Sequence, residues 1–525
     1  MKQTKQCPDY ILAKTETGWE TLKGQGLSYS GKAMTVQLEP GENSLKITAA
    51  STADEFSYLK MRWLSPAEET TLFLGDAFER GYGNLQWQHM NPLRVFPWYF
   101  MMTDAESTAG MGVEVRPDSF CFWQADAEGV TLWMDVRCGG QGVSLRGRAI
   151  HAATVVWRHS LPQEDAFDFA GAFCRRMCED PVLPDQPVYG VNNWYSAYGY
   201  FTEADVLRDA RLLGEMTTGW ENRPFYILDD GWQEHSIRGY NGGPWKKGGE
   251  YFSDMGEIAN GIKACGVRPG IWIRLLWNQD KYLPEELRLQ RDQSYLDVSR
   301  PEVLSQVRED IRRMSDWGYE IIKHDFSTWD TFGKWGFEFQ GNLTTPGWRF
   351  WDTGKTGAEI IKNFYKTIYE ARGNAMILGC NCIGHLGAGW MHINRTGDDT
   401  SGQEWERTRK MGVNTLAFRM PQHNAFYAGD ADCAPVTGAV PWALSEKWLE
   451  LLGKSKSPLL ISADLAKLTA EQKDAVIKAL KNASMAGAAA KPLDWLYTAC
   501  PRKWLLDGEI KEYDWMEKTG IAELE

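Results

Sequence analysis

The chain has no long hydrophobic run and no excess of positive charge. No segment approaches 18 consecutive apolar residues, and the first 20 residues lack an apolar stretch followed by a small-residue cleavage site. We therefore expect no membrane span, and a cytoplasmic protein unless a leader has been removed. The formal net charge of −13 argues against nucleic acid or an anionic membrane as a partner.

Signatures of phosphate-binding and metal-binding loops are also missing. The Gly-containing segments 246–250 and 341–347 match neither a Walker loop nor a dinucleotide fingerprint. The ten cysteines have no paired zinc spacing, and Cys380 and Cys382 form a C-x-C without a second pair. Segment 422–433, QHNAFYAGDADC, suits either a cation site or a loop closed by Asx turns, and the loop is favoured. We expect free thiols, no metal and no cofactor.

Aromatic residues, in contrast, are abundant. The 25 Trp, 20 Tyr and 21 Phe residues could serve as platforms for the apolar C–H faces of sugars, while ring N–H and O–H groups meet hydroxyls. A large core with an aromatic-rich β-domain explains the same numbers. Composition alone therefore favours carbohydrate only slightly.

Residues 1–185 have the alternation of β-strands. Short runs such as AMTVQLEP, SLKITAA, GVTLWMDVRC and ATVVWRHSL are separated by Gly, Asp and Pro. This pattern predicts an antiparallel β-sandwich. Segment 181–190, PVLPDQPVYG, disfavours both helix and central strand and marks a domain boundary.

Residues 186–480 alternate short apolar runs with helical stretches, as successive βα units do. Thr202 and Asp205 resemble a capping box at the start of one helix. Eight runs are candidate strands: 188–196, 224–232, 267–276, 319–326, 375–383, 390–399, 412–420 and 458–465. Eight strands close a barrel, so we predict an α/β chain in which a (β/α)8 TIM barrel follows the sandwich. Residues 481–525 form a short C-terminal segment, either a small β-appendage or a packing segment.

Carboxylates stand at the ends of the fourth and sixth runs, where a barrel of this kind carries its chemistry. Lys323 and Asp325 are two residues apart and share one strand face, so the ammonium group is expected to keep Asp325 ionised as a nucleophile. Asp399 lies 74 residues further on, the length of two βα units. A retaining glycosidase needs one ionised and one protonated carboxyl group, about 5 to 5.5 Å apart. The two strand ends are suited to supply them.

The second run ends in Asp229 and Asp230, which can accept several sugar O–H bonds, and Trp232 is positioned to wall the site. Each such Asp has an ordinary alternative as a turn former or helix N-cap. The joint occurrence on three candidate strands favours a site.

Four motifs resemble the α-galactosidase-like enzymes, or melibiases, of glycoside hydrolase families 27 and 36, and family 36 more closely. They are LDDGWQ (228–233), IIKHDF (321–326), RTGDDT (395–400) and SPLLISADLAKLT (457–469). GDAFERGYGNLQW (75–87) also looks like a family 36 loop that reaches over the barrel.

The resemblance implies retaining hydrolysis of terminal α-D-galactosides through a glycosyl-aspartate intermediate, without a cofactor. It implies Asp325 as nucleophile and Asp399, four residues after Arg395, as acid/base, while Asp398 stays open as the alternative. An oligosaccharide or glycoside is the expected substrate. The implied sugar contacts are Asp229, Asp230, Trp232, Lys323, Arg395 and Trp194.

The fifth run departs from the family pattern. GCNCIGH places Asn381, Cys382 and His385 where family members choose between a 2-hydroxyl and a 2-acetamido sugar, and neither familiar pattern is present. Asn381 and Cys382 are therefore further candidate sugar contacts. Open alternatives are an α-N-acetylgalactosaminidase, a β-L-arabinopyranosidase, a transglycosidase and a non-catalytic sugar-binding barrel. The sequence leaves the aglycone and the oligomeric state open.

Overall fold

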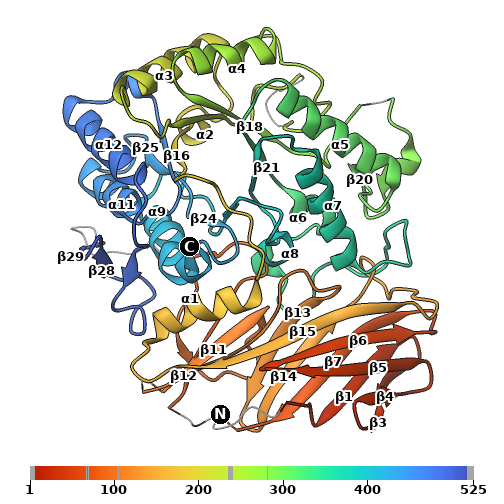
Figure 1. Cartoon of the computed structure of the whole chain (residues 1–525). Helices are drawn as coiled ribbons and strands as arrows, with labels where there is room; N and C mark the ends of the chain where they lie inside the picture. Colours follow the sequence, from red (N-terminus) through yellow and green to blue (C-terminus); the bar gives the residue numbers. More distant parts are fainter. Residues whose placement is uncertain are drawn as a thin grey trace.

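The structure is a computed structural model that describes residues 6–516, except 67, 69, 105, 235–239 and 281. Two antiparallel sheets form the N-terminal sandwich (Figure 1). The first has the order β10 (Phe96–Pro97), β13 (Phe120–Asp126), β14 (Gly129–Asp135), β7 (Phe56–Leu64), β1 (Tyr10–Thr15) and β2 (Gly18–Thr21). The second has the order β3 (Lys23–Gln25), β4 (Ser28–Ser30), β5 (Met34–Gly41), β6 (Ser44–Ser51), β15 (Ala149–His159), β12 (Thr108–Val113), β11 (Tyr99–Thr103), β8 (Leu72–Gly75) and β9 (Gln88–His89). The predicted sandwich is confirmed.

Strand alternation explains the sandwich core. In β5, Met34, Val36 and Leu38 are buried while the residues between them are exposed, because successive side chains of a strand point to opposite faces. Helix α1 (Ala166–Met177) follows β15 and begins at Asp165, whose side chain accepts hydrogen bonds from two backbone N–H groups of its first turn.

The barrel consists of parallel strands, as the βα pattern predicts. Their order is β24 (Ala428–Asp430), β23 (Ile393–Arg395), β22 (Met376–Gly379), β21 (Ile321–His324), β18 (Arg268–Ile273), β17 (Phe225–Leu228), β16 (Tyr189–Asn192), β26 (Leu459–Ala463) and β25 (Ala434–Val436). β24 pairs with β23, and β25 pairs with β26. These two strands are successive parts of one segment interrupted near Asp432, which has a φ of 75°. The nine pieces are therefore eight barrel strands, and the predicted (β/α)8 fold is confirmed.

The prediction of a strand at 412–420 is wrong. That stretch forms the π-helical segment η3 (Arg409–Asn414) and helix α10 (Thr415–Arg419), and the seventh strand begins at Ala428. Residues 412–420 are all buried, so their apolar run shows no periodicity that separates a strand from a buried helix.

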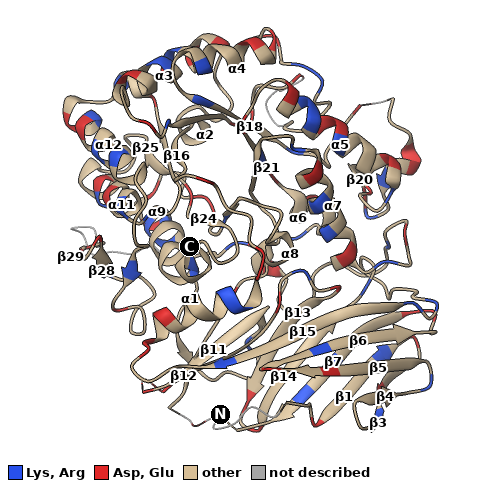
Figure 2. Cartoon of the chain, in the orientation of Figure 1, with Lys and Arg blue, Asp and Glu red and all other residues tan. Residues whose placement is uncertain are grey.

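Helices surround the barrel, and their charged residues are spread over outer helices such as α5 (Pro301–Asp316) and α12 (Ala470–Ala483) (Figure 2). Helix α3 begins with the predicted capping box of Thr202 and Asp205, and it buries Val206, Ala210 and Leu213. The longer helices are α3 (Glu203–Met216), α4 (Met255–Ala264), α5 (Pro301–Asp316), α7 (Gly357–Ala371), α11 (Trp442–Lys454) and α12 (Ala470–Ala483). Short ones are α2 (Trp194–Ala197), η1 (Glu285–Leu287), α6 (Ser327–Phe332), η2 (Gly336–Glu338), α8 (Gly384–Gly387), α9 (Trp405–Thr408), η4 (Met420–Gln422) and η5 (Leu465–Lys467).

Two small sheets complete the chain. One is the hairpin β19 (Arg288–Leu289) and β20 (Asp292–Leu296), and the other joins β27 (Lys491–Pro492), β28 (Lys503–Leu506) and β29 (Glu509–Glu512). Within the described part of the chain, no helix has the length and apolar character needed to cross a membrane. The ten cysteines are free thiols.

Candidate active site

A pocket of about 350 Å³ lies at the C-terminal ends of the barrel strands. It brings together side chains from the second, fourth and sixth strand ends, as the barrel rule predicts. Its walls are Arg80, Tyr82, Trp194, Asp229, Asp230, Asn241, Trp272, Lys323, Asp325, Phe326, Trp335, Phe337, Cys380, Arg395, Asp398, Asp399 and Arg407.

Asp325 follows β21 directly. Its Oδ1 accepts a hydrogen bond from the backbone N–H of Phe326 at 2.7 Å, and its Oδ2 accepts one from Trp272 Nε1 at 3.1 Å. Two donors thus fix the orientation of the carboxylate at the pocket wall. His324 lies on the other side of the strand, against the rings of Phe364 and Tyr365 in α7, as alternation along the strand predicts.

Lys323 is also in the pocket, but its closest carboxylate partner is not Asp325. Its Nζ lies 2.6 Å from Asp229 Oδ2, and Asn192 Nδ2 donates to the same oxygen at 2.6 Å. Burial by itself lowers the pKa of Lys323, but Asp229, with Cys380 and Asp325, outweighs it, so that the pKa is raised. The ammonium group is therefore a fixed positive charge that links the second and fourth strand ends.

Asp230 differs from its neighbour because, among the described residues, no cationic group forms a hydrogen bond with it. Its Oδ1 accepts a hydrogen bond from Gln233 Nε2 at 2.6 Å. Burial, together with the nearby Asp229 and Asp325 charges, raises the pKa of Asp230 to about 7, although Gln233 and Arg274 act in the opposite direction. Asp230 therefore changes charge near neutral pH.

Arginines hold both carboxylates of the sixth strand end. Arg395 Nη2 donates to Asp399 Oδ1 at 3.0 Å, and Arg80 Nη1 lies 3.5 Å from the same oxygen. Arg80 Nη2 lies 3.1 Å from Asp398 Oδ1, and Arg407 Nη2 lies 2.9 Å from Asp398 Oδ2. Burial by itself raises the pKa of Asp399, but Arg395 and Arg80 outweigh it and lower the pKa to about 2. Asp399 is therefore ionised, and 37% of its side chain is exposed.

Asp432 holds Arg395 from behind the pocket. Its Oδ1 lies 3.0 Å from Arg395 Nη1, while its Oδ2 accepts from Tyr195 Oη at 2.5 Å and from the backbone N–H of Thr400 at 2.7 Å. Asp430 Oδ1 accepts from the backbone N–H of Asp432 at 2.9 Å, the kind of local closure expected of an Asx-turn loop. Among the described residues, no group of three or more His, Cys, Asp or Glu side chains has a metal-binding arrangement.

Three of the expected sugar contacts lie outside the pocket walls. Trp232 is fully buried against Trp245 and Trp317, and its Nε1 donates to the carbonyl of Trp272 at 2.8 Å. Its size and the polar neighbours in LDDGWQ suggested a wall, but Gly231, with a φ of 125°, turns the chain before it.

Asn381 and Cys382 are the other two. Asn381 has a φ of 54°, which breaks the strand alternation after β22 and leaves Cys380, not Cys382, in the pocket. Asn381 Nδ2 instead bonds Glu79, and Cys382 Sγ lies 3.4 Å from His324 Nε2. His385 stacks on Trp98 of the sandwich, with 4.7 Å between the ring centroids.

The structure adds residues from outside the strand ends to the site. Arg80 and Tyr82 come from the sandwich segment after β8, within the GDAFERGYGNLQW motif, which suggested a loop over the barrel but no particular residue. Trp335 and Phe337 come from the segment after α6, at the start of η2 and within it. Tyr82 and Phe337 meet edge to face, with 4.8 Å between their ring centroids.

Comparison with solved structures identifies the architecture. A scan of protein-family models and a search of curated proteins give no match. The α-galactosidase TtGalA from Thermus thermophilus, in complex with p-nitrophenyl α-D-galactopyranoside, superposes with a TM-score of 0.62 at 14% identity, over 96% of this chain and 99% of that chain.

The chain has the fold of the family 36 α-galactosidases. The GH36 α-galactosidase AgaA from Geobacillus stearothermophilus, in complex with 1-deoxygalactonojirimycin, superposes with a TM-score of 0.57 at 14% identity, over 89% of this chain and 69% of that chain. TtGalA in complex with stachyose gives a TM-score of 0.58 at 15% identity, over 90% and 99% of the two chains. The predicted resemblance is thus confirmed at the level of the fold.

Proposed function

We propose that this protein is a retaining glycoside hydrolase that acts on terminal α-D-galactosides. The observation that carries the proposal is one pocket in which Asp325, held by Trp272 and a backbone N–H, shares the strand ends with Asp398 and Asp399. Two carboxyl groups are what double displacement needs. The shared fold with α-galactosidases makes the galactoside the first substrate to test.

In this proposal Asp325 attacks the anomeric carbon and forms a glycosyl-aspartate intermediate. Asp399 first donates a proton to the leaving oxygen and then removes one from the water that releases the sugar. Asp229 and Asp230 at the second strand end and Lys323 on β21 bind sugar hydroxyls. Asp229 and Lys323 are already paired at 2.6 Å, so they offer a preformed polar surface rather than two free charges.

A related specificity remains open at the fifth strand end. Cys380 faces the pocket there, at 3.7 Å from Arg395 Nη1, where the sequence suggested Asn381 and Cys382. A panel of nitrophenyl glycosides separates an α-galactosidase from an α-N-acetylgalactosaminidase or a β-L-arabinopyranosidase. Adding a sugar acceptor separates hydrolysis from transglycosylation.

The decisive test is Asp325→Ala, with Asp474→Ala on the exposed face of α12 as the matched control. We expect Asp325→Ala to fold normally and to lose several orders of magnitude of turnover of p-nitrophenyl α-galactoside. Azide should restore part of the turnover and yield the β-galactosyl azide, because a small anion then enters where the carboxylate attacked. Near-normal turnover by Asp325→Ala would exclude the assignment.

One observation favours a second candidate, a non-catalytic sugar-binding barrel. Both carboxylates of the sixth strand end are ion-paired with arginines, and Arg395 and Arg80 lower the pKa of Asp399, which disfavours Asp399 as a proton donor. This candidate predicts tight galactose binding by calorimetry with no release of sugar from any glycoside of the panel.

A further inference from the structure

The sandwich domain inserts a charged residue into the barrel pocket. The backbone of Gly81 pairs with the sixth strand end, since its N–H donates to Thr396 O at 2.7 Å and its carbonyl accepts from the N–H of Asp398 at 2.9 Å. These two bonds fix the register between the sandwich segment and the carboxylate-bearing loop. Arg80 therefore stands beside Asp398 and Asp399 as a consequence of backbone pairing, not of a flexible side chain alone.

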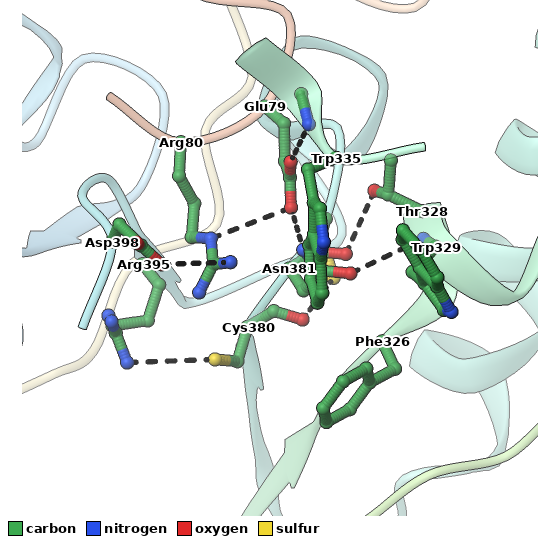
Figure 3. A network of polar contacts seen from close by, with 12 residues as sticks. Glu79, Arg80, Phe326, Thr328, Trp329, Trp335, Cys380, Asn381, Arg395 and Asp398 are labelled. Atoms are coloured by element: carbon green, nitrogen blue, oxygen red, sulfur yellow. Dashed lines mark hydrogen bonds and ion pairs between the residues drawn. The ribbon is translucent and has the colours of Figure 1, made fainter. Parts of the chain in front are cut away.

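Arg80 is anchored on its far side by Glu79. The Glu79 side chain is fully buried and lies 3.5 Å from Arg80 Nε (Figure 3). Glu79 Oε2 accepts from Tyr82 Oη at 2.9 Å and from the backbone N–H of Gly336 at 2.7 Å, and its Oε1 accepts from Asn381 Nδ2. Glu79 thus joins three segments of the site and fixes the guanidinium group from behind.

The guanidinium group lies between Glu79 and Asp398 (Figure 3). Its side chain is only 6% exposed, and its Nη atoms lie 3.1 Å from Asp398 Oδ1 and 3.5 Å from Asp399 Oδ1. A buried cation at these distances favours the ionised form of a carboxyl group over the protonated form. Arg80 is therefore placed to act on the group that must both donate and accept a proton.

Other charged and titratable groups face the same pair. Asp399 faces Arg395 from β23, Lys323 from β21, and the hydroxyl groups of Tyr195 and Tyr198 at and after α2. Asp398 faces Arg407 from α9 and, besides Arg80, the sandwich residues Glu79 and Tyr82. Only Arg80 contacts both carboxylates with its cationic group among these neighbours.

We infer that Arg80, anchored by Glu79, is a positioning residue that holds the acid/base carboxylate in its base form, so that the sandwich domain takes part in the proposed hydrolysis. The inference rests on the proposed function. A cation beside this carboxylate assists the second step, in which a base activates water, and opposes the first step, in which the same group must be an acid. Arg80 thus sets the balance between the two steps.

The experiment is the pH profile of kcat/KM for Arg80→Gln, with Arg80→Lys as the charge-conserving variant and Arg62→Gln as the control. Arg62 pairs with Asp126 within the sandwich. For a glycoside with a poor leaving group, we expect the alkaline limb to move upward by about one pH unit in Arg80→Gln. The limb should stay at the wild-type position in Arg80→Lys and in Arg62→Gln. A uniform loss of activity at every pH would overturn the inference, because misfolding lowers the amount of active enzyme without moving the limb.

Removing Arg80 alone takes a cationic partner from three carboxylates, those of Glu79, Asp398 and Asp399, and could destabilise the fold. The double variant Glu79→Gln/Arg80→Gln is therefore the second test. It removes opposite charges together, which proteins tolerate better than an unpaired charge. We expect the alkaline limb of kcat/KM to move to higher pH in this variant as well. An alkaline limb at the wild-type pH would overturn the inference. If the wild type turns over galactosides and Asp325→Ala does not, the proposed function stands. An alkaline limb that does not move in the Arg80 variants then refutes only the role given to Arg80. An inactive wild type refutes the proposed function and, with it, this inference.

Discussion

Replacing Asp230 with asparagine removes one negative charge from the pocket and keeps the volume of the side chain. The amide oxygen of the new side chain can still accept the hydrogen bond that Gln233 Nε2 donates to Asp230 Oδ1. The ionised form of Asp230 is unfavourable in the folded protein, because burial is the largest cause that raises its pKa from 3.8 to about 7. The substitution should therefore stabilise the fold at the pH where Asp230 is ionised.

The sign and the size follow from linkage between folding and protonation. A carboxyl group whose folded pKa is raised destabilises the fold as pH rises from its unfolded pKa to its folded pKa. One pH unit corresponds to about 1.4 kcal/mol, so a change from 3.8 to about 7 costs about 4 kcal/mol at most when the group is ionised. The free energy of unfolding of Asp230→Asn, taken relative to that of the wild type, should therefore increase by about 2 to 3 kcal/mol from pH 5 to pH 8.

The assay is urea unfolding followed by Trp fluorescence at both pH values. Asp474→Asn, on an exposed position of α12, removes the same charge and should show no such pH-dependent gain. In parallel, Asp230→Asn should raise KM for galactosides, because the proposal gives Asp230 a sugar hydroxyl. A gain that is equal at pH 5 and pH 8, or a loss at pH 8, would refute the reasoning.

Two further predictions concern the acid/base assignment and acid stability. Arg407→Gln should leave the alkaline limb of kcat/KM at the wild-type pH, because Arg407 pairs with Asp398 and not with the proposed acid/base Asp399. A shift of this limb to higher pH would identify Asp398 as the acid/base instead. Burial lowers the pKa of His324 to about 3, so the fold loses stability as pH falls below 6.5. Between pH 6.5 and pH 4.5, the free energy of unfolding should therefore fall by up to about 3 kcal/mol less in His324→Leu than in the wild type. Urea midpoints at both pH values measure this, and an equal fall in the two proteins would contradict the prediction.

The parts of the fold that periodicity determines were predictable from the sequence. Alternation gave the sandwich strands, and the capping box of Thr202 and Asp205 gave the start of α3. The seventh barrel strand was not predictable in the same way. It is divided near Asp432, and the fully buried run before it forms helices, so neither stretch carries a distinguishing period.

The site residues were likewise predictable only where a local sequence pattern determines their position. Asp229, Lys323 and Asp325 were predictable because carboxyl ends of parallel strands meet at one face of a barrel. Cys380 was missed because the left-handed backbone of Asn381 breaks the strand alternation on which the prediction relied. Arg80 was missed because its place depends on pairing between segments more than 300 residues apart in the chain, which no local pattern encodes.

The most direct test of the proposed mechanism is covalent trapping of the nucleophile. A slow fluorinated galactosyl substrate, such as an activated 2-deoxy-2,2-difluoro or 5-fluoro galactoside, should accumulate as a glycosyl-enzyme, and peptide mass spectrometry should locate the sugar on Asp325. The label should be absent from Asp325→Ala. A label on another carboxylate, or continued galactoside turnover with no covalent adduct, would contradict double displacement through Asp325.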